Sequence, residues 1–293
     1  MGAKIYQNKK YIAFFLIPAF VFMLIFLYYP FIQNIINSFQ HIKYMGTAAD
    51  KWNAPFYKNY LEIFKDPKML IALKNTGIMI IATIVGEVGL AIVLSLLVSN
   101  IKKGAGFFRV VYFFPIVISA TALGLLFNLV FLYDKGMINQ LLQLIGVLDA
   151  GKNELIDWKA THPMFTMLVP VIWQYVGFYF IILLTGLSGI PEDLYEAAEI
   201  DGASKLQQVR YVTLPLLRNS ICTCVVLAVT GALKVFDLPW TMFVNGMSNT
   251  WLTGTYMYSK VYVDVDYSSA IAVVIVIIGV VLSVVVNQIF KDK

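Results

Sequence analysis

Charged residues are scarce in this sequence. Asp, Glu, Lys and Arg together make up 13% of the 293 residues, whereas hydrophobic residues make up 59%, and the mean hydropathy is +0.76. A soluble domain carries about 25% charged residues, so this chain has too few to cover a water-facing surface. The charges that remain lie mostly between long apolar runs. The sequence therefore predicts an integral membrane protein with lipid as its main solvent.

Cysteine and histidine are rare as well. Cys222 and Cys224 lie two positions apart in an apolar segment, and His41 and His162 are isolated. This inventory excludes a disulfide framework and a four-ligand metal site, so we expect no metal ion in this chain.

A phosphate-binding loop of the form G-x-x-x-x-G-K-[ST] is also lacking, because the nearest phrase, residues 202–205, has the wrong spacing. The chain is therefore not expected to hydrolyse ATP by that route. We predict that it is not an enzyme, that it has no catalytic residue, and that it holds no cofactor of its own.

The net charge of +5 does not indicate a nucleic-acid partner. The cations form no dense stripe with interleaved aromatic residues, and most of them stand at the ends of apolar runs. That placement is typical of membrane topology signals.

Six stretches are long and apolar enough to cross a hydrocarbon core of about 30 Å, which takes about 20 helical residues. The sequence thus predicts one all-α transmembrane domain over residues 1–293. The expected spans are 11–30, 70–99, 110–133, 164–187, 220–239 and 268–290. The connectors 31–69 and 134–163 have room for short helices near 59–64 and 138–145, although irregular loops fit their composition equally well.

The distribution of Lys and Arg predicts the orientation. With the N-terminus inside, the cytoplasmic pieces hold 11 cations in roughly 55 residues and the outer pieces hold 9 in roughly 100. All three arginines fall on the cytoplasmic side. We therefore expect a multi-pass protein of the cell membrane with both termini cytoplasmic.

The connector between the fourth and fifth spans, residues 189–219, is the most organised one. It carries five of the chain's 17 acids within ten residues. Gly202 is placed to end a helix in a left-handed conformation. Ser204 and Gln207 form the pattern of a capping box that opens a second helix. We expect Pro215 to break that helix before the fifth span begins.

This helical pair is predicted to dock on a protein. Leu194, Ala197 and Ala198 recur at the spacing of one helix face, and the small residues allow close backbone approach in a partner's groove. An amphipathic helix resting on lipid headgroups is the alternative, but such helices are usually rich in Lys and Arg, whereas this one is acidic.

The phrases Glu196-Ala197-Ala198, Asp201-Gly202-Ala203 and Thr213-Leu214-Pro215 resemble the EAA loop of type I ABC importer permeases. The chain is similar in particular to the carbohydrate-uptake branch that includes the maltose and glycerol-3-phosphate permeases, and weaker matches run along nearly its whole length. One departure is that residues 245–248 read Asn-Gly-Met-Ser where the family often has Gly-Gly-Pro.

The resemblance implies the type I permease fold and a set of partners. These are a second permease subunit, as a heterodimer by family habit, two ATP-binding subunits that hold ATP and Mg²⁺, an extracellular solute-binding protein, and a sugar or oligosaccharide as cargo. It also implies that the EAA loop couples ATP hydrolysis to the spans, with Glu196 as the polar contact and Gly202 as the turn. The expected coupling residues are Glu196, Ala197, Ala198, Asp201, Gly202, Leu214 and Pro215.

Polar and aromatic residues near the fourth and fifth spans are candidates for the substrate pathway, because burying polar groups in lipid is costly. In the family, the helices on either side of the EAA loop line the cavity. The candidates are Trp173, Gln174, Tyr175, Phe178, Thr230, Lys234, Asp237 and Trp240. Alternatively, the aromatics form interfacial belts, and Lys234 pairs with Asp237 at i, i+3.

Glu87 is the one acid deep in an apolar run. It favours a second hypothesis, an ion-coupled secondary carrier that uses this carboxyl as a relay. No chain of membrane acids accompanies it, and a hydrogen bond to a neighbouring helix explains it as well.

Overall fold

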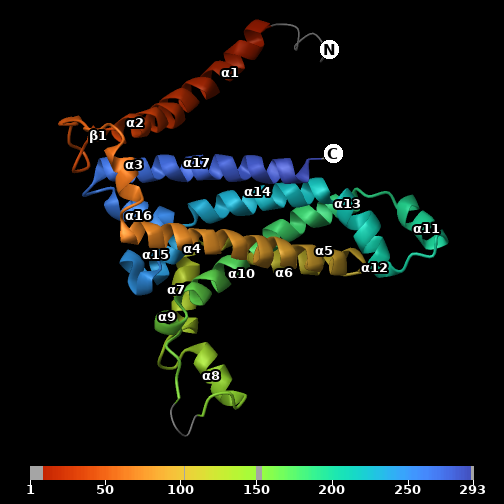
Figure 1. Ribbon diagram of the computed structural model, residues 1–293. Coiled ribbons are helices and arrows are strands. Elements are labelled where there is room, and N and C mark those ends of the chain that lie inside the picture. The colour runs from red at the N-terminus through yellow and green to blue at the C-terminus, as the bar shows by residue number, and fades with distance from the viewer. Residues whose placement is uncertain (1–8, 102, 150–153, 292–293) are drawn as a thin grey trace. The chain divides into compact units, whose positions relative to one another are not determined.

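The computed structural model describes residues 9–101, 103–149 and 154–291 (Figure 1). Nearly all of the regular structure is helical, and the one sheet is a two-residue pairing. The cations Lys4, Lys102, Lys152 and Lys293, which enter the topology prediction, lie outside the described residues.

The chain forms two compact units. One comprises residues 1–66 and 257–274, and the other comprises residues 67–256 and 275–293. The last long helix, α17 (Val265–Phe290), contributes its first turns to the smaller unit and the rest of its length to the larger one.

The smaller unit begins with the apolar helices α1 (Lys9–Met23) and α2 (Tyr29–Asn37), which a π turn joins into one candidate span, Tyr11–Asn37. Strands β1 (Gln40–His41) and β2 (Lys51–Trp52) then form an antiparallel pair, and α3 (Lys58–Ile63) follows. Of the two alternatives that the sequence left open near 59–64, a short helix or an irregular loop, the structure has the helix.

Polar contacts hold the first turn of α17 to the rest of the smaller unit. The buried Asn59 amide donates to the Ser38 carbonyl at 3.1 Å and to Asp266 Oδ2 at 3.0 Å. The Tyr267 hydroxyl donates to Asp66 Oδ2 at 3.0 Å. Because buried polar groups without partners are costly, these bonds fix how α2, α3 and α17 meet.

The larger unit is a bundle around α10 (Pro163–Ser188). Helices α4 (Pro67–Thr83) and α5 (Leu90–Ser99) form a second continuous span through a π turn at Ile84–Gly89. Helix α14 (Arg218–Lys234) and the C-terminal part of α17 complete the bundle. The connector 134–163 contains α8 (Met137–Leu144), the helical one of the two alternatives that the sequence left open, and α9 (Trp158–Thr161).

The third expected span, 110–133, is broken. It consists of α6 (Ala105–Val117) and α7 (Ala120–Val130), which meet at 96°. Ile118 and Ser119 between them are extended, and Pro115 near the end of α6 removes a helical hydrogen bond. Among the described residues five helices are long and apolar enough to cross a membrane, or six if this bent pair counts as one span.

These helices confirm the expected all-α membrane fold. Their order continues after α10 with α11 (Asp193–Ile200), α12 (Lys205–Gln208), a π turn at Val209–Thr213, and α13 (Leu214–Leu216). After α14 come α15 (Asp237–Met242), a 3₁₀ turn at Val244–Asn249, and α16 (Thr253–Lys260).

Close packing of α10 depends on Gly177. A Cβ at this position would lie 1.8 Å from the Tyr112 carbonyl oxygen of α6. One turn further along α10, the fully buried Phe180 ring packs edge-on against the Tyr112 ring at 5.3 Å between centroids. The absent side chain therefore lets the two backbones approach, as small residues do in membrane helix pairs.

We expect Gly177→Ala to destabilise the protein, because α10 and α6 must separate to admit the methyl group. Overpacking of this kind costs about 1–3 kcal/mol. The matched control is Gly77→Ala in α4, where a Cβ would meet no atom within 4 Å, so that this change is neutral or stabilising. Thermal unfolding in detergent measures both, and equal midpoints for the two variants would contradict the packing argument.

Candidate functional site

A cavity of about 290 Å³ lies among the helices of the larger unit. We call it the α10–α14 cavity after the helices that contribute most of its polar wall. Its polar and aromatic lining residues are Thr83, Glu87, Gln174, Tyr175, Tyr179, Lys234, Phe236 and Asp237. Four of these, Gln174, Tyr175, Lys234 and Asp237, are among the residues that the sequence analysis selected.

The other four candidates lie outside this lining. Trp173 packs edge-on against Phe127, with 5.8 Å between the ring centroids. The Thr230 hydroxyl donates to the Val226 carbonyl of its own helix at 2.9 Å. Phe178 packs against Tyr179, and the Trp240 ring stacks on Phe236 at 5.5 Å. Phe178 and Trp240 therefore each pack against a residue that lines the cavity, Tyr179 and Phe236 respectively.

Two breaks in the helical backbone shape the cavity. One is the extended pair Ile118–Ser119, whose Ile118 carbonyl accepts a hydrogen bond from Gln174 Nε2 at 3.2 Å. The other follows Lys234, where Val235 is extended. In a bilayer, irregular backbone is tolerated only where it is buried in protein or lines a cavity. Val235 lines the cavity, and the Ile118 carbonyl is paired by the Gln174 amide of the cavity wall.

The break after Lys234 also rules out the i, i+3 pairing with Asp237. Helix α14 ends at Lys234 and α15 begins at Asp237, so the two residues do not share a continuous helix face. Within the described part of the chain they form no ion pair, and both side chains are exposed at the cavity. They are therefore available to a ligand.

Glu87 lies at the wall of the same cavity with 3% of its surface exposed. It stands in the π turn between α4 and α5, next to Gly86, where a Cβ would meet the Ile172 side chain of α10 at 2.6 Å. Tyr179 lies beside its carboxyl. Sequence reasoning found Glu87 but missed Thr83, Tyr179 and Phe236, which only the packing brings to the cavity.

A second recess, of about 780 Å³, lies where α11 and α12 meet the ends of α5, α6 and α10. Figure 1 shows α11 and α12 at the end of the bundle opposite α8. Glu196 lines this recess, together with Arg109, Tyr195, Glu199, Lys205 and Gln208. Of the other expected coupling residues, Ala198 and Leu214 are half-buried, and Ala197, Asp201, Gly202 and Pro215 are exposed.

The turn between α11 and α12 is built as the sequence predicts. Gly202 has a φ of +78°, the left-handed region that costs glycine little. The Ser204 side chain accepts from the Gln207 backbone, and the Gln207 side chain accepts from the Ser204 backbone, which completes the capping box. A hydrogen bond from Lys205 lowers the pKa of Glu199 below its ordinary value and closes the turn.

The helix break expected at Thr213-Leu214-Pro215 lies two residues later. Pro215 falls in the first turn of α13, and a turn at Leu217 separates α13 from α14. In an α-helix the proline ring clashes with the carbonyl four residues earlier. Here a π turn precedes it, and Leu214 N–H donates to the Val209 carbonyl five residues back. This wider turn accommodates the proline, as π turns and helix distortions commonly occur together.

Large apolar side chains project from this end of the unit. Ile200 at the end of α11 is 87% exposed, and Leu206 in α12 is 79% exposed. Within the described residues no group of three His, Cys, Asp or Glu side chains could hold a metal ion. The two exposed apolar side chains therefore lie in the same segment as the exposed acids Glu196 and Glu199.

Removal of the capping box is expected to loosen α12. Ser204→Ala deletes the acceptor for the Gln207 backbone, a change that costs about 1 kcal/mol at helix N-caps. Hydrogen–deuterium exchange should rise several-fold at residues 205–208. Ser99→Ala is the control, since its hydroxyl donates only to a carbonyl of its own helix. Unchanged exchange in the Ser204 variant would contradict the capping role.

Comparison with known proteins identifies relatives over nearly the whole chain. The family described as "Binding-protein-dependent transport system inner membrane component" matches residues 88–292. The probable ABC transporter permease protein YurN of Bacillus subtilis is 33% identical over 97% of each chain. The arabinooligosaccharides transport system permease protein AraP of Halalkalibacterium halodurans is 31% identical, over 95% of this chain and 87% of the relative.

The fold is also found in a solved structure. A bacterial ABC transporter involved in the import of the acidic polysaccharide alginate contains a chain that superimposes with a TM-score of 0.80. The match covers 98% of this chain and 97% of that one, at 20% sequence identity.

Proposed function

Because this chain belongs to the family of binding-protein-dependent transport system inner membrane components, we propose that it is the sugar-conducting permease subunit of an ATP-driven importer. It is a multi-pass membrane transport component, not an enzyme. The observation that carries the sugar assignment is the α10–α14 cavity, a small polar and aromatic space inside a bundle of membrane helices. The relatives are named as transport permeases, which favours this function over that of a self-powered ion-coupled carrier.

The chemistry of the cavity suits a carbohydrate. Sugar hydroxyls donate and accept hydrogen bonds, and the Gln174 amide and the Tyr175 hydroxyl offer both roles. The Phe236 ring, backed by Trp240, offers an apolar face to the C–H groups of a sugar ring. The relative AraP is named for transport of arabinooligosaccharides, which agrees with cargo of this class.

Coupling to ATP hydrolysis is assigned to the α11–α12 segment, residues 193–208. In this proposal Ile200 and Leu206 anchor it in a groove of an ATP-binding subunit, with Glu196 as a polar contact and Gly202 as the turn. Exposed large apolar residues beside acids are typical of a protein-docking surface. The orientation that follows places this segment and both termini in the cytoplasm, in agreement with the Lys and Arg distribution.

The α11–α12 segment is connected to the cavity through α14. The Tyr195 hydroxyl lies 3.1 Å from Thr213 Oγ1, which ties α11 to the π turn. From there α13 and a turn at Leu217 lead into α14, whose Ala228, Gly231 and Ala232 line the cavity. Arg218 at the start of α14 donates to the Ile289 and Lys291 carbonyls at 3.1 and 3.0 Å, which joins α14 to the end of α17.

The remaining partners are a second permease subunit, a second ATP-binding subunit, and an extracellular solute-binding protein. The span Tyr11–Asn37 supports the assignment of a membrane partner, because its most apolar stretch is exposed around its whole circumference. The second permease is a different chain in this proposal, which rests on family habit. Purification from native membrane in mild detergent tests the set of partners.

Two substitutions test the coupling assignment. Gly202→Pro forbids the left-handed turn, because proline fixes φ near −65°, and Glu196→Lys reverses a charge on the docking surface. We expect both variants to insert in the membrane normally and to lose ATP-dependent uptake at least tenfold. Gly146→Pro is the control, since Gly146 has a similar φ of +77° in the connector between α8 and α9. Normal uptake in both variants would contradict the assignment of coupling to the α11–α12 segment.

Substrate contact at the cavity is tested by Lys234→Met. A hydrogen bond to a charged group is worth about 1.5–3 kcal/mol, so the apparent KM for uptake should rise at least tenfold while assembly stays normal. Thr230→Val is the matched control, because this hydroxyl bonds only to its own helix. A KM that moves equally in both variants, or in neither, would exclude Lys234 as a cargo contact.

A further inference from the structure

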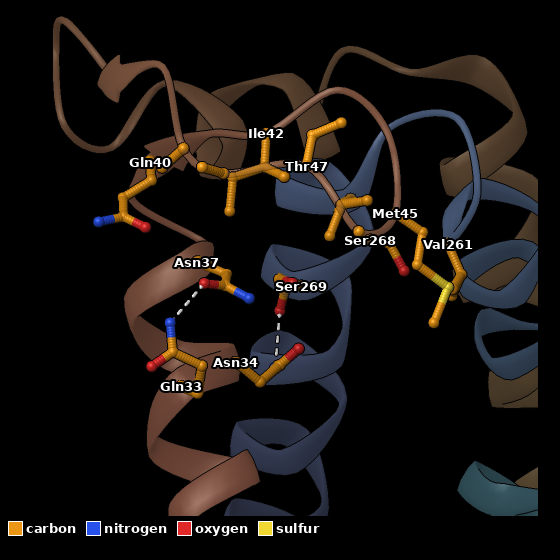
Figure 2. Close-up of a pocket in the computed structure, with 14 residues that line it drawn as sticks. Gln33, Asn34, Asn37, Gln40, Ile42, Met45, Thr47, Val261, Ser268 and Ser269 are labelled. Atoms are coloured by element: carbon orange, nitrogen blue, oxygen red, sulfur yellow. Dashed lines mark hydrogen bonds between the residues drawn. The ribbon is translucent and has the colours of Figure 1, made fainter.

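A separate pocket of about 440 Å³ lies in the smaller unit, at the C-terminal end of α2 (Figure 2). We call it the amide pocket. It is lined by Gln33, Asn34 and Asn37 of α2, by Gln40, Ile42 and Met45–Ala49 of the following segment, and by Val261, Val265, Ser268 and Ser269 around the start of α17. It shares no residue with the α10–α14 cavity.

The lining is polar but uncharged. Of the described residues that form it, none carries a formal charge, and four are carboxamides. Asn37 lies four residues after Gln33 and three residues after Asn34, so its side chain neighbours both on the surface of α2, and all three line the pocket. Figure 2 shows these side chains and Ser269 arranged around the pocket. A volume in the range of about 300–1,000 Å³ is usual for small-ligand sites.

Much of the hydrogen-bonding capacity of these groups is unused. Gln33 Nε2 donates to Asn37 Oδ1 at 3.0 Å, and Asn34 Nδ2 donates to the Ser269 carbonyl at 3.4 Å. These two bonds orient the amides and leave Gln33 Oε1, Asn34 Oδ1 and Asn37 Nδ2 without a partner in the described part of the chain. Half-buried polar groups of this kind are paired by water or by a ligand.

We propose that the amide pocket binds a neutral sugar unit, as a second carbohydrate site of this chain. Carboxamides and hydroxyls both donate and accept, which matches the two roles of a sugar hydroxyl. Ile42, Met45 and Val265 supply an apolar wall for the C–H groups of the ring. A charged ligand is disfavoured, because its burial without a counter-charge costs more than its hydrogen bonds return.

The location makes the pocket accessible from water. Thr47, Ala48 and Ala49 on its rim are exposed. They lie in the segment that joins β1 to β2, which also contains the exposed Lys43, and the exposed Lys51 begins β2. In the proposed orientation this rim lies on the outer side of the membrane. A sugar held there sits on the side from which an importer receives its cargo.

Thiol labelling in the complete purified transporter, without ATP, tests the proposal. The chain's own cysteines are buried, so Thr47→Cys and Ala49→Cys each report on the rim. The probes are the neutral disaccharides maltose, cellobiose and lactose, with digalacturonate as an anionic ligand of similar size. Labelling by a bulky maleimide is read by mass spectrometry of the peptide that carries the new cysteine. Lys51→Cys, on the same strand pair outside the pocket, is the control.

We expect at least one neutral disaccharide to slow labelling of both rim cysteines several-fold and to leave Lys51→Cys unaffected, with no effect of digalacturonate. Adding Asn37→Leu should raise the half-protecting concentration about tenfold, since amide hydrogen bonds are lost, whereas Gln140→Leu in α8 should not.

Protection that survives Lys234→Met separates this site from the α10–α14 cavity. Absence of protection by all neutral probes, equal protection by digalacturonate, or loss of protection with Lys234→Met would overturn the proposal.

Discussion

In the hydrocarbon core, every backbone N–H and C=O must find its partner within the protein. This constraint explains where the bundle departs from regular helix. The irregular pair Ile118–Ser119 leaves a free carbonyl, and the buried Gln174 amide pairs with it. Val235 and Phe236 leave the helix at the wall of the same cavity. Interruptions of the helices and the polar space therefore occur together, because each is stable only in the presence of the other.

The same constraint accounts for the helix distortion before Pro215. A proline in the middle of a helix usually frees a carbonyl and bends the chain. The π turn before Pro215 keeps the backbone bonded through that position. Only the turn at Leu217 then separates this segment from α14, whose residues line the cavity.

Much of the fold follows from the sequence because its signals are local. Long apolar runs predict the spans, and the roles of Gly202, Ser204 and Gln207 follow from turn and cap chemistry that involves only neighbouring residues. The break within residues 110–133 and the π turn before Pro215 were not predictable in this way. Both depend on carbonyl partners supplied by another helix or by a change of helical register, which composition does not reveal.

The cavity residues were predictable in part for a related reason. In a helix that is apolar on all sides, hydrophobic periodicity does not indicate which face turns inward. Sequence reasoning therefore selected Trp173 and Thr230 together with Gln174 and Lys234, although only the latter two line the cavity. Tyr179 and Thr83 resemble ordinary span residues in the sequence. Thr83 precedes Glu87 by four residues in the same span, whereas only helix packing brings Tyr179 of α10 to Glu87.

The position of Glu87 has a consequence for the order in which the chain is assembled. The span Pro67–Ser99 leaves the ribosome before α10, and Tyr179, which lies beside Glu87 in the folded bundle, is 92 positions further along the chain. A carboxyl at mid-span raises the free energy of membrane insertion by about 2.5–3.5 kcal/mol. Until α10 is synthesised, the favourable insertion of the surrounding apolar residues must offset this amount. The hydrophobicity of this span thus serves biogenesis: it keeps the helix in the bilayer until its polar neighbours are made.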